Sequence, residues 1–184
     1  MWCRFYFVVT CAALAQTPCE QLKTLAPAGT VITSAEPLST HCRVAATLKP
    51  SSDSDIKLEV WLPAHSAWNG KFLAIGGGGW VGSINTGGMM TALQEGYATA
   101  STDTGHAGGS ASFAAGHPEK LVDFSHRAVH EMTVTAKAVL SAYYGRSSRL
   151  SYWNGCSTGG KARADRGAEV SGRLRWRHRW GSSE

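Results

Sequence analysis

The pattern of apolar and polar residues predicts four short strands. Residues 56–63 alternate between the two classes and stop at a proline, as in a strand with one buried face. Residues 72–75 form a short apolar run that leads directly into four glycines. Residues 97–102 and 150–153 are further strand candidates, and each opens into a loop rich in glycine and serine. The chain therefore carries small and polar loops directly after its strands.

Two segments between these strands have a helical period. Apolar residues recur every three or four positions across residues 126–144, and Gly145 follows as a helix cap. A shorter helix is expected over residues 89–96, with Gly96 at its end. The order strand, strand, helix, strand, helix, strand predicts an α/β domain with a mostly parallel sheet. Functional loops of such domains lie at the strand ends, where the glycines cluster here.

Residues 1–15 have the pattern of a secretory signal peptide. Arg4 supplies a positive charge, an apolar run follows, and Ala13-Leu14-Ala15 fits a small-x-small cleavage site. The run is too short to span a bilayer. A buried first helix or strand is the alternative interpretation. We therefore expect cleavage after Ala15 and a soluble, secreted, extracellular protein without a membrane segment.

Cleavage would remove Cys3 and Cys11 and leave three cysteines. In an oxidising compartment Cys19 and Cys42 are the natural disulfide pair, because they close a short N-terminal loop. Cys156 then has no partner. It is either a tolerated buried thiol or half of a disulfide whose other half is absent from this chain.

Residues 155–160, Gly-Cys-Ser-Thr-Gly-Gly, fit the G-x-S-x-G pattern of a nucleophile elbow. Such a turn holds its serine in a strained conformation between a strand and a helix, and the glycines remove side chains that would collide there. The predicted strand directly before the motif favours an elbow over an ordinary glycine–serine turn. We therefore predict Ser157 as the catalytic nucleophile.

Backbone N–H groups at two places are candidates for an oxyanion hole. One is the N–H of Thr158, the residue after the nucleophile. The other lies in the glycine loop Gly76–Gly79 that follows the strand at 72–75, with Gly76 and Gly77 as the expected donors. A merely flexible turn is the alternative interpretation of the four glycines.

One aspartate and three histidines elsewhere are weaker candidates. Asp103 and His106 both precede Ser157, whereas the acid and the histidine of an α/β-hydrolase follow the serine. We expect them to line the rim of the site or to hold their loop together. His126 and His130 lie one helical turn apart without an acidic or cysteine partner at a metal-binding spacing, so no metal site is predicted from them.

Four runs of residues closely resemble the tannase and feruloyl esterase family. The resemblance covers about residues 19–161 and is most specific in the elbow. The runs are WNGKFLAIGGGGWVGSI, GYATASTDTGHAGG, GHPEKLVDFSHRAVHEMTVTAKAVLSAYYG and SYWNGCSTGG.

The resemblance implies a secreted α/β-hydrolase that cleaves hydroxycinnamoyl or galloyl esters. Members carry a lid domain after the elbow, usually with calcium, and a disulfide joins the cysteine beside the serine to one beside the catalytic histidine. Cys156 matches the first of these cysteines. Gly77 stands where the family commonly has asparagine, which keeps the backbone donors but loses a side-chain contact. Residues 16–161 are therefore expected to be a partial α/β-hydrolase domain, without the lid or the C-terminal strands.

The resemblance thus implies a serine esterase that acts on a small phenolic ester from plants through an acyl-enzyme on Ser157 and takes part in the degradation of plant cell-wall polysaccharides. No cofactor is expected in this chain, and calcium is expected only in the lid. Because no plausible acid and histidine follow Ser157, this chain is expected to be inactive. The alternative is a non-catalytic fragment or a small secreted binding protein with a basic tail.

The net charge of +5 is concentrated in the tail. Residues 161–184 contain seven basic and three acidic residues, and the rest of the chain is nearly neutral. Arginines and aromatic residues alternate in RLRWRHRW as they do in proteins that bind single-stranded nucleic acids. The predicted secretion and the neutral main domain argue against such a partner. A disordered tail or a cationic surface segment remains open.

An out-of-frame translation explains residues 162–184 better. Among the products of permitted codons read one base later is HGLTEAQRYPADYDGVIAGAP, which resembles the helix and strand that continue the family. The codons of Trp176 and Trp180 have no freedom, and each forces a glycine in the shifted frame.

Sequencing the transcript across the Lys161 codon tests this hypothesis. We expect the neighbouring frame to encode the family-like helix and strand, because the constrained codons already agree with it. An unbroken frame to a stop after Glu184, with no such continuation in the neighbouring frame, would contradict the hypothesis.

Overall fold

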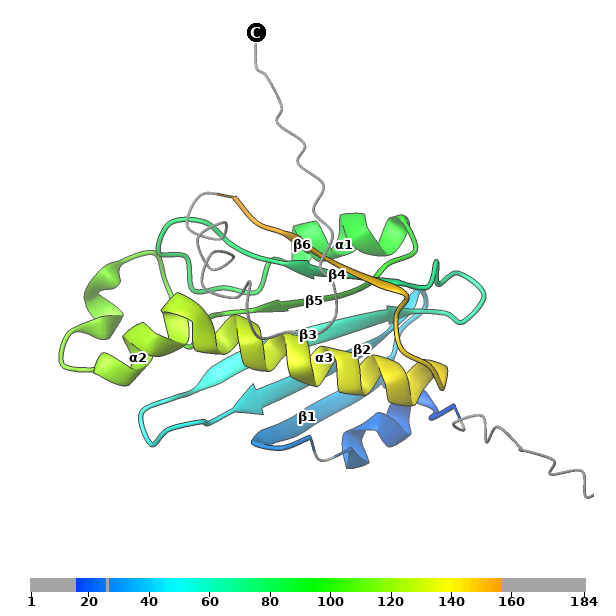
Figure 1. The fold of residues 1–184 in the computed structure, drawn as a ribbon, viewed down its shortest axis with the longest axis horizontal. Coiled ribbons are helices and arrows are strands. Elements are labelled where there is room, and N and C mark those ends of the chain that lie inside the picture. Colours follow the sequence, from blue (N-terminus) through cyan, green and yellow to red (C-terminus); the bar gives the residue numbers. More distant parts are fainter. Residues whose placement is uncertain (1–15, 26, 157–184) are drawn as a thin grey trace, which may run out of the picture.

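The computed structural model describes residues 16–25 and 27–156, which form a six-stranded sheet with helices on both faces (Figure 1). The predicted signal peptide and all residues from Ser157 onward lie outside the described part of the chain. The strands are β1 (Thr30–Pro37), β2 (His41–Leu48), β3 (Ile56–Pro63), β4 (Lys71–Ile75), β5 (Ala98–Thr102) and β6 (Leu150–Asn154). The helices are α1 (Thr86–Gln94), α2 (Pro118–Val122) and α3 (Ala128–Tyr144), with short helical turns η1 (Cys19–Thr24), η2 (Ala111–Ala114) and η3 (Asp123–Arg127).

The predicted α/β class is confirmed, but the sheet is mixed rather than mostly parallel. Its order is β1-β2-β3-β5-β4-β6, and only β4 makes parallel pairs, with β5 and β6. The β1–β2, β2–β3 and β3–β5 pairs are antiparallel. Short turns connect β1, β2 and β3, and short turns can join only antiparallel neighbours. The longer connections that contain α1 and α3 return the chain for parallel pairing.

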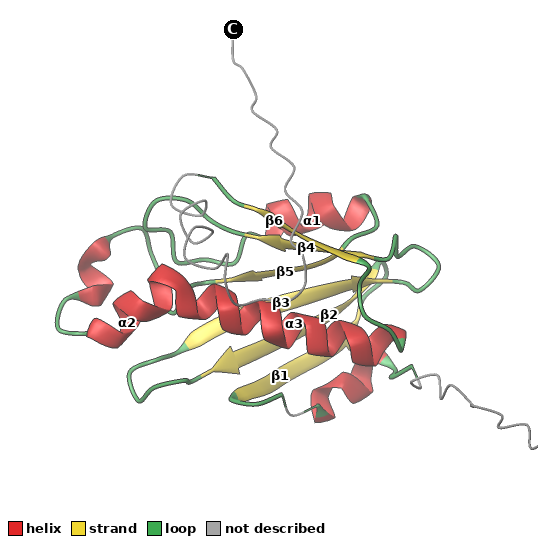
Figure 2. Ribbon diagram, in the orientation of Figure 1, coloured by secondary structure: helices red, strands yellow, loops and turns green. Residues whose placement is uncertain are grey.

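The two long helices cover opposite faces of the sheet (Figure 2). Val60 and Trp61 are neighbours on β3 and therefore point to opposite faces. Val60 belongs to the core beneath α3, which includes Met132. Trp61 packs with Met89 of α1 in a second, smaller core. No helix in the described part of the chain has the length and apolar character needed to cross a membrane.

Both predicted helices exist, with shifted boundaries. The predicted apolar stripe of α3 is buried except at Tyr143, which is partly buried while Tyr144 lies in the core, and Gly145 ends the helix with a φ of 66°. The helix begins at Ala128 rather than at residue 126, because η3 occupies the preceding turn. In contrast, α1 starts three residues earlier than predicted, at Thr86, because the Asn85 side chain caps it.

The predicted Cys19–Cys42 disulfide is confirmed. It joins η1 to β2, and both cysteines are buried in the main core. The bond therefore fixes the N-terminal turn against the sheet instead of closing an irregular loop.

A partly buried ion pair between Arg43 and Glu59 stabilises the sheet on the face that Trp61 occupies. Two nitrogens of Arg43 donate to the Glu59 carboxylate, and the Trp61 indole N–H donates to the same carboxylate at 2.7 Å. Burial raises the pKa of Glu59, but the hydrogen bonds from Arg43 and Trp61 outweigh that effect and leave the pKa below its ordinary value. The pair therefore stabilises the fold above the ordinary carboxyl pKa, and this stabilisation is lost as the pH falls through the lowered pKa.

Replacement of Arg43 by leucine should lower the free energy of unfolding by about 2 kcal/mol at neutral pH, because it leaves the buried Glu59 without its cation. Urea unfolding measures the change. Lys57→Leu on the neighbouring strand β3 is the matched control, since the Lys57–Asp55 pair is exposed and should contribute less than about 1 kcal/mol. Equal losses in the two variants, or an Arg43→Leu loss that does not shrink in acid, would rule out this account.

Candidate active site

The carboxyl ends of β4 and β6 lie side by side, so the two predicted parts of the site meet. Ile75 pairs with Asn154, and the Gly76 N–H donates to the Asn154 carbonyl at 2.8 Å. Gly76–Gly79 follows β4, while Gly155 and Cys156 follow β6. The predicted nucleophile Ser157 and the donor Thr158 lie outside the described residues, directly after Cys156. Their roles stay predictions.

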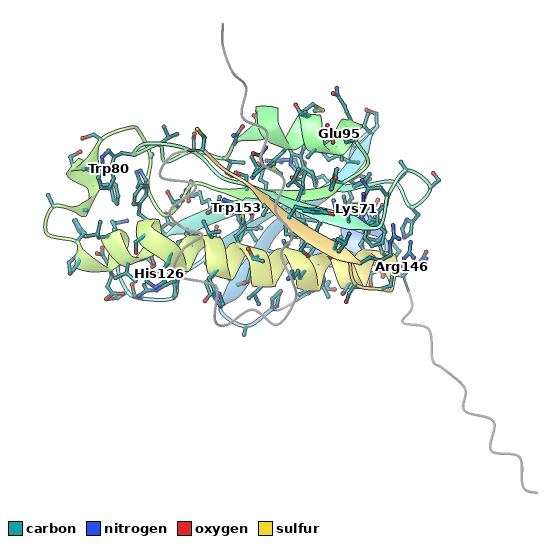
Figure 3. The ribbon with its side chains drawn as sticks, turned by 45° about the horizontal axis from the view of Figure 1, so that its top comes forward. Lys71, Trp80, Glu95, His126, Arg146 and Trp153 are labelled. Atoms are coloured by element: carbon teal, nitrogen blue, oxygen red, sulfur yellow. A yellow bond between two sulfur atoms is a disulfide. The ribbon has the colours of Figure 1, made fainter. Side chains whose placement is uncertain are left out.

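Glycine is required sterically at the first position of this loop. A Cβ on Gly76 would lie 2.6 Å from Cζ2 of Trp153, a side chain that is largely buried. Figure 3 shows Trp153 over the middle of the molecule and Trp80 at its edge. Gly77 is less restricted, because its nearest neighbour would be the Val81 carbonyl at 3.8 Å. Gly76 therefore allows close packing, whereas the backbone of Gly77 is open to a ligand.

An open cleft of about 500 Å³ lies between the glycine loop, the start of α1 and the end of β6. Residues 75–78, 81, 83–88 and 154–156 line it. A cleft of this size accommodates a small organic ligand. Gly77 and Cys156, on two sides of the cleft, are exposed.

Asn85 is a residue of the cleft that sequence reasoning missed. Its side-chain oxygen accepts the Gly88 N–H at 2.9 Å, and its side-chain nitrogen donates to the Gly76 carbonyl at 3.3 Å. Asparagine directly before a helix is a helix-capping signal, because its side-chain oxygen accepts a backbone N–H of the first helical turn. Two adjacent glycines at Gly87 and Gly88 obscured that signal, because glycine disfavours helix interiors.

Asp103 holds its own loop, as predicted. Its carboxylate accepts the backbone N–H groups of Lys57 at 2.9 Å and Gly105 at 2.8 Å. Burial raises the pKa of Asp103, and these two hydrogen bonds only partly offset the effect.

His106 ties the same loop to the glycine loop. Its Nε2 lies 2.9 Å from the Trp80 carbonyl, which can only accept, so Nε2 carries the hydrogen. The ring stacks on Phe113 with centroids 3.7 Å apart. The Gly82 N–H also donates to the Gly108 carbonyl at 2.7 Å. Hydrogen bonds between the two loops thus fix the far end of the glycine loop.

The remaining polar candidates, His126 and His130, lie in η3 and α3. His126 lies in η3, with its Nδ1 at 2.9 Å from the Ser125 hydroxyl. Across the described residues, no group of three histidine, cysteine, aspartate or glutamate side chains converges as a metal site would require. Calcium in a lid domain stays an expectation. The Cys156 thiol is exposed at the cleft, so the interpretation as a buried thiol is wrong, and no described cysteine pairs with it.

Residues 42–165 match the family model for tannase and feruloyl esterase, a span that includes both sides of the cleft and the complete elbow. An uncharacterized esterase of Xanthomonas campestris pv. campestris is 42% identical over 138 residues, which are 74% of this chain and 23% of the relative. A probable feruloyl esterase B-1 of Neosartorya fischeri is 39% identical over 131 residues, 70% of this chain and 25% of the relative.

The solved structures agree with these matches. Feruloyl esterase B from Aspergillus oryzae superposes with a TM-score of 0.70 at 30% identity, over 77% of this chain and 32% of that one. Tannin acyl hydrolase from Aspergillus niger shares the fold, with a TM-score of 0.62 at 23% identity over 86% of this chain and 33% of that one. The chain spans about a quarter of the length of the curated relatives it matches. Since the family model covers well over half of the chain, this protein belongs to the tannase and feruloyl esterase family.

Proposed function

We propose that this chain carries the nucleophile and the oxyanion donors of a secreted serine carboxylic-ester hydrolase. The observation that carries the proposal is the parallel pairing of β4 with β6, which sets the glycine loop beside the residues that lead into Ser157. The open cleft between them supports it, as does membership of a family whose named relatives are esterases. Relatives named feruloyl esterase B and tannin acyl hydrolase favour a hydroxycinnamoyl or galloyl ester as the substrate.

In the proposed mechanism the Ser157 hydroxyl attacks the ester carbonyl carbon and gives its proton to a base. The backbone N–H groups of Thr158, Gly76 and Gly77 are the candidates that stabilise the oxyanion. Because the Gly76 N–H already donates to Asn154, Gly77 is the stronger candidate on that side of the cleft. The C–O bond then breaks, the alcohol leaves with a proton, and water hydrolyses the acyl-enzyme to release the acid.

The mechanism also needs a catalytic base and an acid. After Ser157 the sequence offers Asp165, Glu169, His178 and Glu184, all within the predicted out-of-frame tail. We propose that a chain with this tail turns over at least about 10³-fold more slowly than one with a complete triad.

Secretion is part of the same proposal. The Cys19–Cys42 disulfide supports an oxidising compartment, in agreement with the signal-like residues 1–15.

Hydrolysis of methyl ferulate and methyl gallate tests the proposed function. The assays use the protein encoded by the sequenced transcript. Replacement of Ser157 by alanine should abolish turnover, because it removes the nucleophile. Ser151→Ala, a serine of β6 whose hydroxyl lies near Ser148, is the control and should keep turnover. Turnover that survives in Ser157→Ala would refute the mechanism. Absence of turnover in the unmodified protein would support a non-catalytic fragment or binding protein instead.

A further inference from the structure

The Asn85 side chain links the start of α1 to the end of β4. The Gly88 N–H can only donate, so the group that faces it at 2.9 Å is the Asn85 oxygen. The side-chain nitrogen is therefore the group that faces the Gly76 carbonyl, at 3.3 Å. The Asn85 backbone N–H also donates to the Ser101 hydroxyl at 3.1 Å, which fixes the residue to β5. The orientation of the amide thus follows from its partners.

The bond to the Gly76 carbonyl also determines where the Gly77 N–H points. In a planar trans peptide the C=O of one residue and the N–H of the next point in opposite directions. A peptide between two glycines can rotate to the opposite orientation at low cost, because neither residue has a Cβ. The positive end of α1 further favours a carbonyl oxygen that faces it. Asn85 and the helix end therefore select one of two accessible orientations.

We propose that Asn85 is a positioning residue that holds the Gly76–Gly77 peptide so that the Gly77 N–H is available to the oxyanion. The proposal rests on the esterase function proposed above. Asn85 acts through the peptide and does not touch the ester carbonyl. A donor that is oriented before the reaction needs no reorganisation as charge develops on the substrate oxygen, which is the condition for a large rate effect.

Two substitutions separate this role from helix capping. Asn85→Asp keeps an acceptor for the Gly88 N–H but lacks the donor to Gly76. Asn85→Ser is also a good helix cap, lacks the amide and adds no charge. The matched control is Asn69→Asp, because Asn69 makes the same kind of pair at the other end of α1: it accepts from the Lys71 N–H and donates to the Glu95 carbonyl.

The experiment uses the protein encoded by the sequenced transcript. It measures ester hydrolysis and follows the Gly77 amide resonance by NMR. Thermal unfolding checks that each variant folds. Both Asn85 variants should lower kcat at least about tenfold with KM within about threefold, since the lost interaction acts in the transition state. Gly77 should give a second or broadened resonance in both variants and one sharp resonance in the unmodified protein. Asn69→Asp should keep the kcat and the single Gly77 resonance.

Several results would overturn the proposal. One is an unchanged kcat in both Asn85 variants. Another is a lowered kcat in Asn85→Asp with an unchanged kcat in Asn85→Ser, because the loss would then be due to the added charge. A third is a single sharp Gly77 resonance in both variants. A protein without Ser157-dependent turnover would defeat the proposed function alone. In that case the Gly77 resonance still decides whether Asn85 orients the peptide.

Discussion

The parallel pairing of β4 with both of its neighbours is the constraint on which the site depends. It brings the carboxyl ends of β4 and β6 to the same edge of the sheet, where Ile75 pairs with Asn154. Because side chains alternate along a strand, a slip of one residue would move Trp153 to the other face. The close packing of Trp153 on Gly76 would then be lost. The register of β6 against β4 therefore determines both the packing of Trp153 and the position of the glycine loop beside the cleft.

Four consecutive glycines do not form an ordered loop by themselves, because glycine has a large conformational freedom to lose. Here the order comes from neighbouring segments. Asn85 holds the carbonyl at the start of the loop, and His106 holds the Trp80 carbonyl at its far end. The loop can thus keep bare backbone beside the cleft and still have a defined shape. Asp103 and the aromatic ring of Phe113 contribute indirectly, since they fix the loop that carries His106.

The sequence predicted the elements with strong local signals. Helical periodicity located α3, a short apolar run located β4, the glycine- and serine-rich loop that follows helped to locate β6, and the two N-terminal cysteines predicted the disulfide. It did not predict β1 and β2 or the antiparallel half of the sheet. β1 alternates weakly because it lies at the edge of the sheet, where several of its residues are exposed. The contacts of Asn85 with Gly76 and of His106 with Trp80 were also missed, because each depends on segments brought together only by folding.

The half of the site that lies between residues 75 and 156 is organised by contacts within that span. The glycine loop is held by Asn85, His106 and Trp153, and none of these contacts involves a residue after Cys156. These contacts hold the glycine loop that carries Gly76 and Gly77, the proposed oxyanion donors on this side of the cleft. Removal of triad groups from serine hydrolases leaves a residual rate that comes from the oxyanion hole and substrate binding. Under the proposed mechanism, a defect in the base slows nucleophilic attack while the Asn85 hydrogen bond to the Gly76 carbonyl stays in place, so that stabilisation of the oxyanion and activation of the serine are separate requirements.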